Sequence, residues 1–493
     1  MIPPSEDNET RQFPKNDPRE VFGWKMYDWA NSAFYTTVVG ALYGPYLTEI
    51  TQRVVGENGT VINLGPAGAI TAKSFFPTCV SVAVFLQVFM LPILGGIADY
   101  SNLKKRLMAL FCYIAVIANC LMFFVTGRLY LLGGLLFIMA NLGFGASIVF
   151  YNAFLGEITT EDQRDKISSR GFAYGYLGGG LLLALNFLLV ISAGRLGLDV
   201  SLAVRLSLLS AGVWWGGFAL ITFARLKTRI AEKSLPRGKT YLTVGFSELG
   251  RTFRELARLR HTLKYLIAYL FYNDGIQTVI SMASVFIAQE LFVSRGLKTD
   301  ESFLLIIFLM VQFVAIVGAL GFERLAYVIN TKNAILVSLL LWCGVVIYGY
   351  AVFHTTREAW IMAAVIAIVL GGSQALSRSL FSRMIPAGRE ASFFGIYEVS
   401  ERGTSWMGPL VFGAVVAATN SYRQAMLSLI VFFVVGTALL YFTKPTKQFT
   451  KQETCCRKRP HLRSRKRKLG IASTGGFPSL TNRCLFQTNS RAV

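Results

Sequence analysis

The amino-acid sequence predicts an all-α membrane protein of about twelve transmembrane helices, arranged as two six-helix pseudo-repeats. Hydrophobic residues make up 53% of the 493 residues and charged residues only 15%, too few for the surface of a soluble chain of this length. Apolar runs of roughly 20 residues, the length that crosses the hydrocarbon core, recur along the chain. A basic stretch in the middle divides six of these runs from six others.

The apolar runs give the order of the membrane spans. Six are expected before the basic stretch, near 28–48, 75–97, 107–126, 130–154, 171–193 and 202–223, and six after it, near 264–289, 302–321, 333–353, 359–380, 393–416 and 423–442. The chain is thereby divided into a cytosolic N-terminal segment (1–24), a first six-helix bundle (25–223), a basic cytosolic middle loop (224–263), a second six-helix bundle (264–442) and a basic, disordered cytosolic tail (443–493).

The positive charge predicts the orientation of the chain in the membrane. Its net charge is +22, and the tail 443–493 alone holds thirteen Lys or Arg against one acid, Glu453. Cations also gather in every second connection between spans, which is typical of cytosolic loops. We therefore expect a multi-pass integral membrane protein with both termini in the cytosol. Membrane topology accounts for the charge, and no nucleic-acid partner is expected.

Two further features lie in the loops. Residues 240–262 predict a basic amphipathic helix, since Leu and Phe return at helical spacing. Such a helix either lies on the anionic leaflet, as the basic tail also can, or is a solvated connector. The long first outer loop contains Asn58-Gly59-Thr60, which is either a used glycosylation sequon or a chance match.

Polar and ionisable residues within the spans are the candidates for contact with a solute or a coupling ion. Such groups are costly in a membrane and usually face protein or a water-filled cavity. The candidates are Asp28, Asn31, Ser32, Asn152, Asn273, Asp274, Gln277, Gln374, Arg378 and Glu398. Helix N-capping is the alternative for Asp28, and a side chain that only reaches for the interface is the alternative for Arg378.

Asp274 is the favoured functional carboxylate because it lies about ten residues into its span. At that depth it is a candidate proton carrier. A zwitterionic solute needs both an anionic and a cationic partner, and Asp274 and Arg378 supply the two signs. Glu398 and Arg402 have the spacing of a helix ion pair. We expect these charges, with Glu401, to form an inter-helix network that rearranges between two conformations.

The two halves of the chain also share a short pattern. The first span begins with Asp28-Trp29-Ala30-Asn31-Ser32, and the seventh contains Asp274-Gly275-Ile276-Gln277-Thr278. Both follow the order acid, two spacers, amide, hydroxyl. Their occurrence at equivalent spans favours parallel repeats around a site near the middle of the membrane.

A second motif lies between spans two and three. Gly95 allows close helix approach, and Asp99 can cap an adjoining helix N-terminus. The cluster Lys104, Lys105 and Arg106 follows. This arrangement resembles the conformational latch of the major facilitator superfamily, from which it departs at Asn102, where Gly is usual.

A narrower resemblance, over roughly residues 20–442, is to the autophagy-related vacuole effluxer family within that superfamily. The stretches that carry it are Tyr27 to Phe34 (YDWANSAF), Tyr151 to Leu155 (YNAFL) with Gly175 to Gly178 (GYLG), Tyr272 to Thr278 (YNDGIQT), and Gly371 to Ser379 (GGSQALSRS) with Phe393 to Gly395 (FFG). The resemblance implies amino-acid efflux, from the vacuole lumen to the cytosol in fungal members. The long loop insertions of fungal members are absent here. A prokaryotic member would act in the plasma membrane.

The expected function is therefore secondary active transport of a small solute, most simply an amino acid, by alternating access with proton coupling. The alternative is a membrane-embedded enzyme acting on a lipid-linked substrate. An enzyme would need a cluster of catalytic or metal-binding side chains, whereas His261, His354 and His461 are scattered through the sequence. The seven cysteines show no metal-binding spacing. We expect no enzyme activity, no metal and no cofactor.

Overall fold

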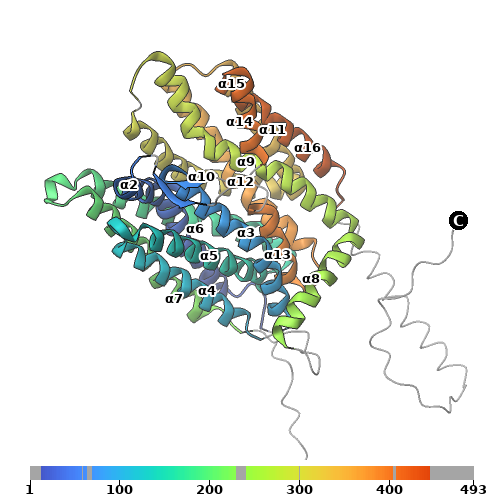
Figure 1. Cartoon of the computed structure of the whole chain (residues 1–493). Helices are drawn as coiled ribbons and strands as arrows, with labels where there is room; N and C mark the ends of the chain where they lie inside the picture. Colours follow the sequence, from blue (N-terminus) through green and yellow to red (C-terminus); the bar gives the residue numbers. More distant parts are fainter. Residues whose placement is uncertain are drawn as a thin grey trace, which may run out of the picture. The chain divides into compact units, whose positions relative to one another are not determined.

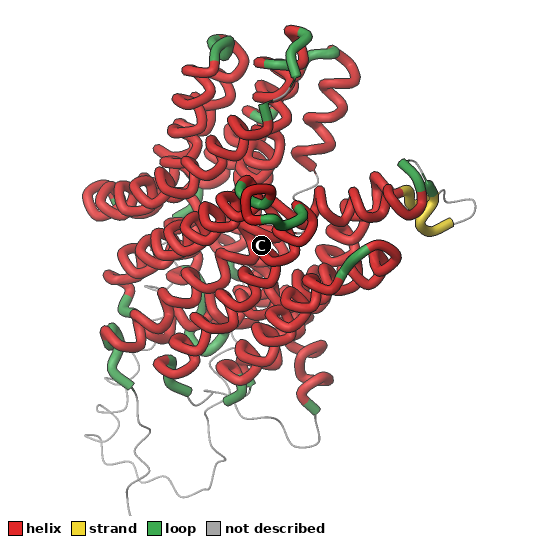
Figure 2. The backbone as a smooth tube through the Cα atoms, turned by 90° about the vertical axis from the view of Figure 1, so that its left-hand side faces the viewer, coloured by secondary structure: helices red, strands yellow, loops and turns green. Residues whose placement is uncertain are grey.

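The computed structural model describes residues 13–57, 59–63, 69–100, 102–228, 240–298, 300–402 and 407–444. Asn58 of the predicted sequon, and the predicted tail from residue 445 onward, lie outside these residues. The described part is almost entirely helical (Figures 1 and 2).

Among the described residues, sixteen of the longer helical elements fall into two sets of eight, which we call the first half and the second half, and short 3-10 helices occur in several connections. The first half comprises α1 (Pro18–Ala33), η1 (Phe34–Leu42), α2 (Tyr43–Val55), α3 (Ala72–Asp99), α4 (Lys104–Leu121), α5 (Tyr130–Ile158), α6 (Arg164–Ile191) and α7 (Val200–Arg225). The helix α8 (Tyr241–Arg258) belongs to the middle loop. The second half comprises α9 (Arg260–Leu291), α10 (Glu301–Ile329), α11 (Thr331–Ala351), α12 (Thr356–Arg383), α13 (Glu390–Arg402), α14 (Met407–Thr419), α15 (Tyr422–Ser428) and α16 (Ile430–Tyr441).

The predicted all-α membrane fold is confirmed. Among the described residues, ten helical segments are long and apolar enough to cross a membrane: α3 to α7, α9 to α12, and α15 with α16. The two remaining predicted spans correspond to α1–η1–α2, which is helical throughout but contains the π-helical segment η1, and to α13 and α14, which flank residues 403–406. Large apolar side chains such as Phe85, Ile117 and Val317 are exposed, as expected for a surface that faces lipid.

Several boundaries differ from the predicted ones. The first span begins at Pro18 rather than near residue 28, because Asp17 caps the helix and Pro18 occupies its first turn. Apolar runs locate the part of a helix within the membrane and miss its polar first turns. A short antiparallel hairpin, β1 (Thr60–Asn63) with β2 (Ala69–Thr71), lies in the predicted outer loop and was not expected (yellow in Figure 2).

The halves pack against each other through a few helices. Helix α3 lies against α13, and α6 lies against both α10 and α12. Within the second half, α10 and α12 approach so closely that a Cβ atom at Gly371 would collide with the carbonyl oxygen of Ala315. Helix α8 contacts α3, α9 and α13 (Figure 1), so the middle loop is packed against both halves.

Candidate functional site

An ion pair between the halves forms the centre of the candidate site. Arg378 of α12 is only 4% exposed. Its Nη1 and Nη2 each donate to Oδ2 of Asp28 on α1, at 3.3 Å. The hydroxyl of Tyr151 on α5 donates to the same oxygen at 2.6 Å. Asp28 and Arg378 therefore join the halves through a buried, hydrogen-bonded pair of opposite charges.

The remaining groups of the Arg378 guanidinium also have partners in the first half. Its Nε donates to the Ser168 hydroxyl at 3.0 Å, and Nη2 donates to the Ser168 carbonyl at 2.9 Å. The guanidinium lies over the rings of Phe172 and Trp24, at 4.2 and 4.8 Å from their centroids. A cation held in this way is fixed in position and orientation at the interface.

Asn152 of α5 extends the network to a second ion pair. Its side-chain oxygen accepts from Arg378 Nη1 at 3.4 Å, and its Nδ2 donates to Glu398 Oε1 at 2.8 Å. Glu398 is fully buried and accepts from Arg402 Nε at 3.2 Å. The predicted helix pair of Glu398 and Arg402 is thus present. One amide connects the two ion pairs, and the contacts from Asp28 through Arg378 and Asn152 to Glu398 cross between the halves three times.

Three further candidates lie near this network. Gln374 of α12 accepts from the Tyr176 hydroxyl of α6 at 3.0 Å, which is another bond between the halves. Asn31 is buried, and its Nδ2 has no hydrogen-bond partner among the described residues. Ser32 lies where α1 approaches α6, since a Cβ at Gly175 would lie 2.7 Å from the Ser32 hydroxyl oxygen.

The alternatives for the two central charges do not hold. Asp17, not Asp28, caps α1 through a side-chain bond to the backbone N–H of Arg19. Arg378 does not reach for an interface, because its whole guanidinium is buried and bonded. The sequence identified both residues but did not pair them with each other.

Asp274 belongs to neither of these two ion pairs. Its Oδ2 accepts from the backbone N–H of Gly408, at the start of α14, at 2.7 Å. Its Oδ1 has no partner among the described residues. The neighbouring Asn273 donates to the Glu401 carbonyl at 3.0 Å, whereas Gln277 is partly exposed. The carboxylate bound to Arg378 is therefore that of Asp28, and Asp274 lies within the second half.

Tyr151, Ser168 and Phe172 were not identified as site residues from the sequence. Tyr151 precedes Asn152 in one of the quoted stretches, which was an available signal. Ser168 and Phe172 lie one turn apart on α6, and nothing in their local sequence indicates that they surround a cation.

The predicted latch is a helix cap between the halves. Asp99, at the end of α3, accepts from the backbone N–H groups of Ala391 and Ser392 at 3.0 and 2.9 Å, and from the Ser392 hydroxyl. These groups form the first turn of α13, where a carboxylate is favoured by the unpaired N–H groups and by the helix dipole. A Cβ at Gly95 would collide with the Ala391 carbonyl oxygen, so glycine permits this approach.

Within the described residues, the three cations of the latch form no hydrogen bond or ion pair with the second half. Lys104 forms an ion pair with Glu157 of α5, and Lys105 donates to the Leu226 carbonyl at 2.6 Å. Arg106 is exposed and forms no ion pair within the described part of the chain.

Helix α8 adds a second connection at this end of the bundle. The Tyr100 hydroxyl donates to Glu248 of α8 at 2.7 Å, and Arg389 pairs with Glu248 at 3.2 Å and with Glu255 at 2.8 Å. Burial raises the pKa of Tyr100 to about 12, so its hydroxyl keeps the proton that it donates. Glu248 thus binds one group from each half, and α8 is neither a solvated connector nor only a surface helix.

More bonds between the halves follow at the same end. Arg164 donates to the Ser382 carbonyl at 2.8 Å, and Asp165 accepts from Ser379 at 2.6 Å and pairs with Arg383 at 2.8 Å. We call this end, formed by residues 99–100, 102–104, 157–165 and 379–392, the closed end. It is the end that the sequence predicts to be cytosolic.

Gly95→Ala is expected to lower transport at least about tenfold, because the added methyl group meets backbone rather than a movable side chain and overpacking costs ~1–3 kcal/mol. Counterflow of labelled solute in proteoliposomes measures the effect. Gly217→Ala is the matched control, since no atom lies within 4 Å of a Cβ there. Equal rates in the two variants would exclude close approach at Gly95 as a requirement.

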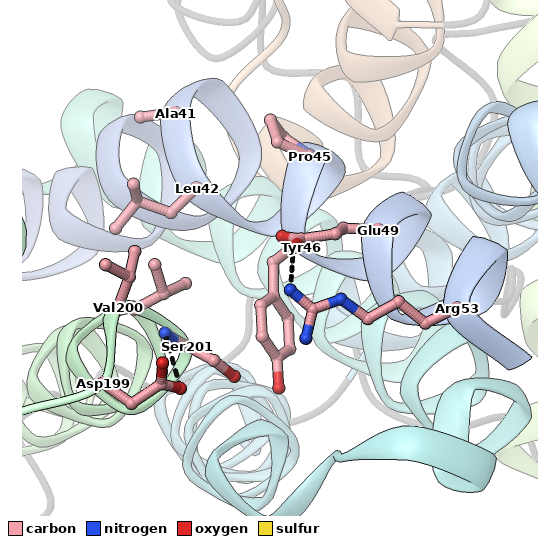
Figure 3. A pocket seen from close by; sticks show the side chains of 10 residues that line it. Ala41, Leu42, Pro45, Tyr46, Glu49, Arg53, Asp199, Val200 and Ser201 are labelled. Atoms are coloured by element: carbon pink, nitrogen blue, oxygen red, sulfur yellow. Dashed lines mark hydrogen bonds and ion pairs between the residues drawn. The ribbon is translucent and has the colours of Figure 1, made fainter.

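A cavity of about 170 Å³ lies away from the closed end, between α2 and the start of α7 (Figure 3). Its charged groups already have partners: Arg53 turns toward Glu49 and forms an ion pair with it, and Asp199 accepts from the Ser201 backbone N–H at 3.2 Å. The ion pair of this cavity lies within one helix, unlike that of Asp28 and Arg378, which joins the halves.

Two helical halves that meet around buried charges are the fold of solved major facilitator superfamily transporters, as comparison with known structures shows. The human organic anion transporter MFSD10 (TETRAN) has a similar fold, with a TM-score of 0.65 and 13% identity over 87% of this chain and 100% of that one. FucP in the outward conformation gives a TM-score of 0.61 with 13% identity over 87% and 99%.

Sequence comparison identifies the family. The family model described as "Vacuole effluxer Atg22 like" matches residues 16–453. The MFS-type transporter YxiO of Bacillus subtilis is 30% identical over 430 residues, 87% of this chain and 95% of the relative. Autophagy-related protein 22-1 of Penicillium rubens is 24% identical over 559 residues, covering 88% and 92%. The chain belongs to the Atg22-like vacuole effluxer family. The Bacillus subtilis relative is described as a transporter and the family as vacuole effluxers, which agrees with transport rather than with the membrane-enzyme alternative.

Proposed function

We propose that this transporter moves amino acids by alternating access. The observation that carries the proposal is the buried pair of Asp28 and Arg378, which places opposite charges from the two halves in contact. In a vacuole-like compartment the flux runs toward the cytosol, and in a prokaryotic plasma membrane the protein is an exporter. Both termini lie in the cytosol in either membrane.

The opposite charges of Asp28 and Arg378 can bind the two charged groups of a zwitterionic solute. A guanidinium binds a carboxylate through parallel N–H bonds, so the α-carboxylate of a solute can replace Asp28 on Arg378. The released Asp28 carboxylate can then accept from the solute ammonium group. Each charge exchanges one partner for another. Neither becomes an unpaired buried charge, a state that would cost several kcal/mol. The exchange replaces the direct bond between Asp28 and Arg378 with contacts that run through the solute, and it thereby couples solute binding to the movement of one half relative to the other.

Asp274 is proposed as the site of proton coupling. It is buried, its Oδ1 is unpaired, and no cation forms an ion pair with it in the described ranges. A carboxyl group in such surroundings exchanges a proton more readily than it holds an isolated charge. FucP and XylE, two structural neighbours, are described as proton symporters.

Flux of labelled amino acids in proteoliposomes, with and without a pH gradient, tests both proposals. We expect the gradient to drive accumulation. In Asp274→Asn it should no longer do so, although exchange of solute across the membrane should continue. Asp199→Asn is the matched control because Asp199 is an exposed helix cap. Absence of flux for every amino acid in the folded protein would refute the substrate class, and gradient-driven flux in Asp274→Asn would refute the coupling role.

A further inference from the structure

An apolar groove lies beside the closed end, where α8 meets α9 and α13. Its volume is about 330 Å³. It is lined by Phe253 and Leu256 of α8, by Leu263, Ile267 and Leu270 of α9, and by Ile396 of α13. The α9 residues belong to the first turns of a membrane-spanning helix, so the groove opens at the edge of the hydrocarbon region.

Helix α8 presents different faces to its surroundings. Glu248 and Thr252 are buried against the closed end, where Thr252 accepts from Arg389 at 2.6 Å. Phe246 and Phe253 lie on another face and are 63% and 53% exposed. An exposed apolar face on a helix packed beside membrane spans is typical of a helix that lies in the interface plane.

Exposed cations lie on the two helices that contribute most of the groove, α8 and α9. Arg254 and Arg258 on α8, and Arg260 and Lys264 on α9, are all exposed. None of the four forms an ion pair with an acid within the described residues. Arg258 directly follows Ala257, and Lys264 directly follows Leu263, both of which line the groove. Unpaired cations beside an apolar groove match a ligand that is anionic at one end and apolar along its length.

We propose that this groove binds an anionic phospholipid of the surrounding bilayer, with an acyl chain along Leu263, Ile267 and Leu270 and the phosphate group near Arg258 and Lys264. In a membrane this surface is in contact with lipid hydrocarbon, and an apolar groove binds hydrocarbon in preference to water. The cations add attraction for an anionic head group over a zwitterionic one.

The lipid stabilises the closed end through α8. The same helix carries the groove residue Phe253 and the closed-end contact Glu248, so binding on one face favours the docked position of the other. Linkage requires the converse too: docking of α8 strengthens lipid binding. This inference does not depend on which solute is transported.

Photo-cross-linking in nanodiscs tests the proposal, with phosphatidylglycerol that carries a diazirine on one acyl chain and a matched phosphatidylcholine. We expect phosphatidylglycerol to label residues 253–270 more strongly than phosphatidylcholine does. Ala257→Trp fills the groove and should remove this labelling. Arg258→Gln combined with Lys264→Gln should reduce labelling by about fivefold per cation, which corresponds to ~1 kcal/mol for each basic residue near an anionic surface.

Arg324→Gln is the control, because Arg324 is an exposed cation at the end of another helix of the second half. Its labelling should equal that of the unmodified protein. Labelling spread evenly over the lipid-facing helices, or equal labelling by the two lipids, would overturn the proposal. So would unchanged labelling in the double variant, which keeps the groove intact and serves as the decisive variant if Ala257→Trp does not fold.

Discussion

Arg378→Gln is expected to abolish amino-acid transport and to lower the stability of the protein. The substitution leaves Asp28 buried without its cation, and removal of one partner of a buried ion pair costs ~3–5 kcal/mol. It also removes the bonds to Ser168 and the contacts with two aromatic rings. Solute counterflow and thermal unfolding in nanodiscs measure the two effects.

Two companion variants separate charge from geometry. Arg378→Lys keeps the positive charge but loses the planar fork, so stability should be largely retained while transport falls. Asp28→Asn combined with Arg378→Gln removes both charges, and it should recover much of the stability but none of the transport. Normal transport in Arg378→Gln would show that the pair has no part in the mechanism.

Asp99→Ala is expected to loosen the closed end. It removes three hydrogen bonds that α3 makes to the first turn of α13. A bond to a charged acceptor contributes ~1.5–3 kcal/mol, so loss of even one favours opening by about tenfold or more. Ser382→Cys places a thiol at a buried position of this end, and its rate of reaction with a water-soluble thiol reagent should rise accordingly.

Asp162→Ala provides the control for this measurement. Asp162 lies in the connection between α5 and α6 and is exposed, and its side chain accepts from the adjacent Gln163 at 2.8 Å rather than from the second half. The reaction rate of the thiol introduced by Ser382→Cys should not change in this background. If Asp99→Ala also left the rate unchanged, the cap would not hold the closed end.

The helix cap formed by Asp99 could be predicted because its chemistry is local. Gly95 and Asp99 lie one turn apart at the end of a span, and capping of a neighbouring helix is the natural role for an acid there. What could not be predicted was the identity of the capped helix. The first turn of α13 lies far along the chain, at a sequence separation of 292 from Asp99 to Ala391.

The sequence identified most of the residues of the candidate site but not which of them bond to each other. Asp28, Asn152, Arg378 and Glu398 were all identified, since polar groups stand out against apolar spans. Asp28 and Arg378 are 350 residues apart, and the pattern of one helix does not determine its depth or rotation against another. Asp274 was therefore favoured over Asp28 as the functional carboxylate, because its depth within its own span was easier to judge.

Features that depend on backbone geometry were also missed. The π-helical segment η1 begins at Phe34, two residues after Ser32, and π-helical turns are frequent at functional sites. Apolar runs do not reveal it, because its composition is that of any span. The docking of α8 was missed for a different reason: its basic, amphipathic composition indicated a membrane surface and concealed the buried role of Glu248.

The central claim is that the two halves separate at the closed end when solute replaces Asp28 on Arg378. Spin-label distances between Lys166→Cys on α6 and Ala387→Cys between α12 and α13, both exposed positions, test it most directly in nanodiscs and in a background without native cysteines. We predict two distance populations, with the longer one increased by the transported amino acid and by Asp99→Ala. A single distance that neither the solute nor Asp99→Ala changes would contradict the account.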